Sequence, residues 1–129
     1  MSKIASAVER AIEQIRASFP DVCLEAIADG SGGAFVTLRN VALGPPWAQP
    51  DTWIGFQITH LYPYADVYPH FVRHDLSRKD GKPLGEGLGQ AKFRNNPAVQ
   101  VSRRSNKLNP ALDTACLKLQ KVLKWLRSR

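Results

Sequence analysis

The chain has 129 residues, with 18 lysines and arginines against 11 aspartates and glutamates, and a formal net charge of +7. A chain of this length is most simply a single domain, residues 1–129, and it can bury an ordinary core without disulfides or metals. No apolar run approaches the roughly 20 residues of a membrane span, and residues 3–16 alternate charged and apolar side chains where a signal peptide has an apolar core. We therefore expect a cytoplasmic protein that makes no membrane contact.

The first third of the chain predicts one helix and two strands. Residues 3–18 form an amphipathic helix that Pro20 ends. Two β-prone runs follow, at residues 22–27 and 34–43, and the glycine-rich segment 29–33 between them predicts a hairpin turn. The apolar side of the helix recurs at three- and four-residue steps: Ile4, Val8, Ala11, Ile12 and Ile15.

The middle of the chain predicts a third strand that ends in an aromatic crossing. Apolar residues alternate with small or polar ones over residues 53–61, the two-residue period of a strand. Tyr62-Pro63 stops this pattern, because proline donates no hydrogen bond, and Tyr68-Pro69 repeats the constraint just before Phe71. We expect a fixed crossing between two neighbouring strands.

The last third predicts a loop, a short strand and a helix. Residues 77–89 are polar and rich in glycine and predict a long loop, and residues 98–102 are predicted as a short strand. Asn109 and Pro110 suit the N-cap and first position of a terminal helix. Both cysteines, Cys23 and Cys116, are expected as buried thiols. The apolar stripe of the helix is Leu112, Ala115, Cys116, Leu119, Val122, Leu123 and Leu126, with Lys118, Lys121 and Lys124 mostly off it.

No motif in the chain predicts a metal or a cofactor. His70 and His74 are four residues apart, but on a strand this spacing does not bring two imidazoles to one metal, so surface or packing roles are favoured. The glycines of residues 85–89 lack the lysine and hydroxyl residue of a P-loop and favour a flexible loop.

Positive charge is concentrated at the C-terminal end. This charge suits an acidic protein surface, a phosphate backbone or plain solvent. One hypothesis is therefore a small nucleic-acid-binding module, with Arg103, Arg104, Lys107, Lys118 and Lys121 on phosphates. Residues 92–129 carry a single acid, Asp113, against Lys92, Arg94, Arg103, Arg104, Lys107, Lys118, Lys121, Lys124, Arg127 and Arg129.

The order of elements, the double Tyr-Pro segment 62–69 and the Asn-Pro helix start together resemble the ubiquitin-conjugating enzyme fold. The closest likeness is to bacterial members that sit beside ubiquitin-like modification genes. This resemblance implies an α+β domain in which an N-terminal and a C-terminal helix pack on an antiparallel β-meander of about four strands. It also implies that the partner is a ubiquitin-like protein or its activating enzyme. The partner-binding residues would be Lys3, Arg10 and Arg16 in the first helix, with Arg103, Arg104 and Lys107 in the basic end.

The chain departs from this family at the catalytic position. Conjugating enzymes hold the modifier on a cysteine between the Tyr-Pro crossing and the following helix, but residues 73–109 contain none. The expected position falls near residues 99–101, where the nearest hydroxyl is Ser102. The resemblance therefore predicts a catalytically inactive or non-standard relative that acts by binding. An alternative is a transferase in which Ser102 accepts the modifier as an oxyester, with Asn95 or Asn96 as amide donor.

Overall fold

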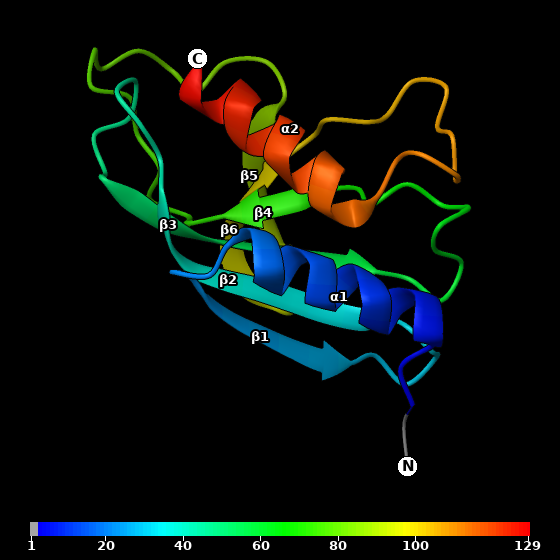
Figure 1. Ribbon diagram of the computed structural model, residues 1–129. Coiled ribbons are helices and arrows are strands. Elements are labelled where there is room, and N and C mark those ends of the chain that lie inside the picture. The colour runs from blue at the N-terminus through cyan, green and yellow to red at the C-terminus, as the bar shows by residue number, and fades with distance from the viewer. Residues whose placement is uncertain (1–2) are drawn as a thin grey trace.

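The computed structural model describes residues 3–129 and has an α+β architecture (Figure 1). Both helices lie on the same side of one antiparallel sheet, whose strand order is β1-β2-β3-β4-β6-β5. Over these residues no helix is both long and apolar enough to cross a membrane. The elements are α1 (Ser6–Ser18), β1 (Cys23–Ala28), β2 (Ala34–Ala42), β3 (Asp51–Ile58), β4 (His70–Val72), β5 (Leu88–Phe93), β6 (Asn96–Val101) and α2 (Ala115–Arg127).

The first helix and the first three strands confirm the sequence prediction. Strands β1, β2 and β3 pair in order as an antiparallel meander. The predicted turn between β1 and β2 is held by Asp29, whose Oδ1 accepts hydrogen bonds from the backbone N–H groups of Ser31 and Gly33. These bonds use the ability of a short acidic side chain to hold nearby backbone in a turn.

The Tyr-Pro segment connects β3 to β4, as predicted. Both of its X-Pro peptide bonds, before Pro63 and before Pro69, are cis. The hydroxyl of Tyr62 accepts a hydrogen bond of 3.0 Å from the N–H of Ala115, the first residue of α2. The crossing is therefore fixed to the helix that follows it 53 residues later.

The sheet has six strands, so the prediction of about four was wrong. Strand β5 was not predicted, because its side chains alternate too weakly in polarity to be recognised, and it begins inside the segment expected as a loop. It becomes a strand by pairing with β6 in a hairpin, in which Leu88 faces Val101 and Phe93 faces Asn96. The left-handed backbone of Arg94 and Asn95 closes this hairpin.

The terminal helix begins later than its Asn-Pro signal predicted. Its N-cap is Thr114, whose hydroxyl accepts a hydrogen bond from the N–H of Leu117. Asn109 and Asp113 instead close a separate turn in which Asp113 accepts from the N–H of Asn109. As a result Leu112, predicted on the apolar stripe, lies outside the helix and is 66% exposed.

One hydrophobic core lies between the helices and the sheet. It joins Val8, Ile12 and Ile15 of α1 to Leu119 and Leu126 of α2, over the inner faces of β2, β3, β4 and β6. The end of α2 is fastened by the buried indole of Trp47, which donates a 2.9 Å hydrogen bond to the carbonyl of Leu126.

The two cysteines occupy different environments. Cys116 is buried between the helices, as expected, and its Sγ lies 3.9 Å from the carbonyl oxygen of Gln14. Cys23 is exposed, so its prediction as a buried thiol was wrong. The reason is that it begins β1 on the strand face that points away from the core, opposite Arg39 of β2.

Candidate functional site

Residues 102–107, which leave β6 toward α2, form the strongest concentration of predicted site residues and are called the basic loop. Arg103, Arg104 and Lys107 are exposed along it, whereas Ser102 and Ser105 are half-buried. The two serines hold the loop against the domain, and the cations between and after them face solvent.

Ser105 fixes the middle of the basic loop to an ion pair. Its N–H and its Oγ donate hydrogen bonds of 2.7 and 2.9 Å to the carboxylate of Asp66, in the Tyr-Pro crossing. The ammonium group of Lys118 in α2 lies 3.0 Å from Asp66 Oδ2 and 2.9 Å from Ser105 Oγ. Burial acts to raise the pKa of Asp66, but the hydrogen bonds from Ser105 and Lys118 outweigh it and lower that pKa. The crossing, the loop and α2 therefore meet at one charged cluster.

This cluster changes the role predicted for Lys118. The sequence placed this lysine off the apolar stripe and made it a phosphate contact, but it is only 8% exposed. Its ammonium is occupied by Asp66 and Ser105, and moving a buried, paired charge to another partner is costly. The prediction of Lys118 as a nucleic-acid contact was wrong.

The arginines of the basic loop lie over aromatic rings. The guanidinium carbon of Arg104 is 4.7 Å from the ring centroid of Tyr68. Trp125 of α2 has two such neighbours, Arg103 at 4.9 Å and Arg129 at 4.6 Å. A guanidinium that stacks on a ring keeps its N–H donors free at its edge, so these arginines are pre-positioned for an anionic partner.

A hollow of about 200 Å³ separates the basic loop from α2. Its charged lining is mainly basic, because four cations, Arg103, Arg104, Lys118 and Lys121, outnumber one acid, Asp113. Net positive charge thus surrounds a small concave surface. The lining residues are Arg103, Arg104, Ser105, Asn106, Asp113, Lys118, Lys121, Val122 and Trp125.

Ser102 has polar neighbours, Gln100 and Tyr68. Its Oγ accepts a 3.1 Å hydrogen bond from Gln100, and its N–H donates to the carbonyl of Gly87. A hydrogen bond with Ser102, aided by Arg104, lowers the pKa of the Tyr68 hydroxyl. In residues 3–129 no histidine or carboxylate forms a hydrogen bond with Ser102 that would activate it as a nucleophile.

Asn95 and Asn96 are not brought to Ser102. Both lie at the turn of the β5–β6 hairpin, where the side chain of Asn96 donates to the carbonyl of Arg94. Ser102 follows the other end of β6, about 20 Å away at about 3.3 Å per strand residue. Neither amide can therefore donate to an oxyanion formed at Ser102 in this arrangement.

The cations predicted on the first helix form a surface of their own. Lys3 precedes α1, and Arg10 and Arg16 lie on its solvent side. Arg16 forms an exposed ion pair of 3.5 Å with Glu13, one turn earlier. These residues are accessible, but they belong to a different element from the basic loop.

Three residues that organise the basic loop were missed in the sequence: Asp66, Tyr68 and Ser105. One signal for Asp66 was present, because it is the only acid between Asp51 and Asp75, in a segment rich in apolar and aromatic residues. An isolated carboxylate in such a segment requires a partner. No sequence pattern identified that partner as Lys118, because the contact spans 52 residues.

Comparison with known protein families, characterised proteins and solved structures gives no significant match to this chain. Within residues 3–129, histidine, cysteine, aspartate and glutamate side chains form no group of three or more that could hold a metal ion.

Proposed function

We propose that this protein is a ubiquitin-conjugating-enzyme-like domain that binds without catalysing, as part of a bacterial protein-modification or defence system. Its partner would be a ubiquitin-like protein or its activating enzyme. One observation carries the proposal. The positions where the family's cysteine is expected lie in β6, and Val99 and Val101 there are 0% exposed, pointing into the core.

The order of elements supports this proposal. An N-terminal helix, an antiparallel meander, a Tyr-Pro crossing and a C-terminal helix occur in the order that the sequence resemblance implies. Strand β6 covers the short strand predicted at residues 98–102, and β5, which pairs with it in a hairpin, was not predicted. The hairpin occupies the segment in which the resemblance expects the nucleophile, and this supports a domain that binds without catalysis.

The basic loop is the surface proposed for the ubiquitin-like partner. Arg103, Arg104 and Lys107 are exposed, and the first two are held over Trp125 and Tyr68. A pre-positioned cationic surface favours a partner with an acidic surface and loses little side-chain freedom on binding. Lys3 before the first helix, with Arg10 and Arg16 on it, forms the second proposed surface, for the activating enzyme.

The experiment is affinity capture with the full chain from an extract of the cells that produce it, followed by identification of the captured proteins. We expect a ubiquitin-like protein or its activating enzyme. Capture of the ubiquitin-like protein should be lost in the Arg103→Glu/Arg104→Glu double variant. The matched control is Lys79→Glu/Lys82→Glu, which makes the same change in charge at two exposed lysines of another loop.

The oxyester alternative has a separate readout. A transferase would form an adduct with the modifier that survives denaturation, is cleaved by hydroxylamine and disappears in Ser102→Ala. We expect no such adduct, because within residues 3–129 no histidine, no carboxylate and neither predicted amide donor forms a hydrogen bond with Ser102. An adduct that depends on Ser102 would overturn the proposal of a domain that only binds.

A nucleic-acid-binding module is the second candidate function, and the stacked arginines of the basic loop favour it. With Lys118 excluded, the phosphate contacts would be Arg103, Arg104, Lys107 and Lys121. Four phosphate contacts release the counterions of four phosphates. For a single strand, the logarithm of the binding constant should therefore fall with the logarithm of the salt concentration at a slope of about −2.8. Absence of oligonucleotide binding at low salt, measured by fluorescence anisotropy, would eliminate this candidate.

A further inference from the structure

The face of the sheet opposite the helices carries its own aromatic cluster. Phe93 is at its centre, with ring centroids 5.1 Å from Phe71, 6.0 Å from Trp53 and 6.2 Å from Phe35. These rings come from β2, β3, β4 and β5, and those of β2, β3 and β4 alternate with core residues such as Val36, Ile54 and Val72. Both helices lie on the other side of the sheet (Figure 1). The tip of the β5–β6 hairpin therefore folds over an otherwise open sheet face.

Gly55 makes room for this arrangement. A Cβ at this position would lie 2.5 Å from Cε2 of Phe93, closer than real contacts allow. The glycine thus lets the Phe93 ring lie directly on the backbone of β3. Because Phe93 also stacks on Trp53, the position of the indole is set by the hairpin tip.

Two adjoining hollows, of about 360 and about 330 Å³, flank Trp53 on this face. Both are lined by Arg39, Trp53 and His74, so they form one groove, which is called the sheet groove. Each volume is within the lower part of the range for small-ligand sites.

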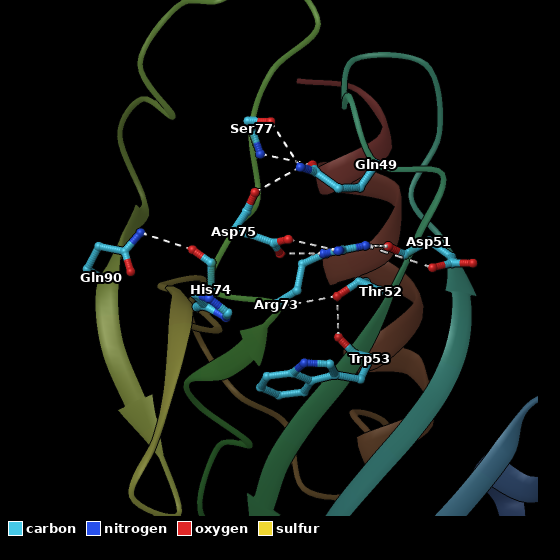
Figure 2. A network of polar contacts seen from close by, with 9 residues as sticks. All are labelled: Gln49, Asp51, Thr52, Trp53, Arg73, His74, Asp75, Ser77 and Gln90. Atoms are coloured by element: carbon cyan, nitrogen blue, oxygen red, sulfur yellow. Dashed lines mark hydrogen bonds and ion pairs between the residues drawn. The ribbon is translucent and has the colours of Figure 1, made fainter.

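A polar network builds one wall of the sheet groove (Figure 2). Arg73 donates two hydrogen bonds, of 2.6 and 2.9 Å, to the carboxylate of Asp75, and a third to the carbonyl of Asp51. The hydrogen bond from Arg73 also lowers the pKa of Asp75. Gln49, in the loop before β3, binds the same segment. Its side-chain amide donates to the carbonyl of Asp75 and the hydroxyl of Ser77, and its side-chain oxygen accepts from the N–H of Ser77. The wall is held in place, and its one arginine, Arg73, is shared between two carboxylates, Asp75 and Asp51.

Two arginines of the sheet groove are left outside its ion pairs. Arg39 and Arg94 line the groove, and within residues 3–129 neither is in an ion pair. Arg94 is held over the ring of Phe35 at 5.2 Å. The acids of the groove are Asp51 and Asp75, which share Arg73, and Glu25, on β1 opposite Thr37. An aromatic surface is thus bordered by two unpaired guanidinium groups.

We propose that the sheet groove binds a nucleobase that carries a phosphate, with the base against Trp53 and the phosphate on Arg39 or Arg94. Bases of every type stack on aromatic side chains, and guanidinium groups match phosphate geometry. Glu25, Thr37 and Asn96 supply acceptors and donors for the edge of the base. This site is distinct from the basic loop, because none of its lining residues belongs to residues 102–107.

The test is titration of the full chain with two probes, adenosine or cytidine monophosphate and a single-stranded eight-nucleotide RNA, at low salt. Binding is measured by calorimetry, and by amide chemical shifts that locate the site. We expect binding to weaken roughly tenfold or more in Trp53→Leu and in Arg39→Glu. Arg39 is exposed and unpaired, so its variant preserves the fold if Trp53→Leu does not. Lys79→Glu, at an exposed lysine of another loop, makes the same change in charge as Arg39→Glu and should bind normally.

The two probes distinguish the sources of the ligand. Binding of the monophosphate supports a free nucleotide, whereas binding of the RNA alone supports a single strand, provided that Arg39→Glu weakens it. The inference is overturned if neither probe binds at millimolar concentration. It is also overturned if the groove variants bind normally and only Arg103→Glu/Arg104→Glu weakens the RNA, a result that would assign binding to the basic loop.

Discussion

His70 provides the sharpest test of the structure, because it is a histidine fully enclosed in the core. Its side chain is 0% exposed, and neither ring nitrogen has a hydrogen-bond partner among the described residues. Its ring centroid is 4.9 Å from that of Phe56. Burial, together with the nearby charge of Lys118, lowers the pKa of His70 to about 3, although Asp66 acts in the opposite direction.

The shift makes stability depend on pH in a defined direction. The unfolded chain protonates His70 near its ordinary pKa of 6.5, whereas the folded chain does so only near 3. The unfolded state therefore binds more protons between these values, and stability falls as the pH is lowered through this window. Between about pH 7 and about pH 4.5, His70 alone should remove about 2.5 kcal/mol from the free energy of unfolding.

The assay is urea unfolding of the wild type and His70→Leu at both pH values. The variant keeps a side chain of similar size but cannot be protonated, so it should lose about 2.5 kcal/mol less than the wild type. His70→Phe is a second variant in case leucine packs poorly against Phe56. Parallel losses in the wild type and both variants would refute the reasoning, as would NMR signals of a charged His70 ring at pH 5.

Three further substitutions test packing and capping, each by urea unfolding. Lys118→Met leaves the Asp66 carboxylate without its cation and should lower the free energy of unfolding by about 3 kcal/mol. Adding Asp66→Asn should restore part of this stability, and an unchanged stability in Lys118→Met would disprove the ion pair. Gly55→Ala should cost about 1–3 kcal/mol by displacing Phe93, and an unchanged Phe93 environment in NMR spectra would contradict this. Thr114→Ala removes the N-cap of α2 and should lower the free energy of unfolding by about 0.5–2 kcal/mol. An unchanged midpoint of urea unfolding would indicate that the helix begins elsewhere.

The sequence alone was sufficient for elements whose signals are local. The helix of residues 6–18 follows from its apolar period, and the β1–β2 turn follows from glycines beside Asp29. The strand β3 and the Tyr-Pro crossing were predicted for the same reason, because alternation and proline act within a few residues. Sequence reasoning also placed Arg103 and Arg104 on an exposed basic segment, where they lie.

Only the tertiary structure decided the features that depend on distant partners. Strand β5 carries no clear period of its own and exists because β6 pairs with it. The sequence predicts Lys118 as a solvated lysine, but in the fold it is buried and forms an ion pair with Asp66, 52 residues earlier. The sheet groove likewise requires β2, β3 and the hairpin tip to meet around Trp53. Local rules describe what a segment prefers, whereas pairing and burial energies arise only between segments that the fold brings together.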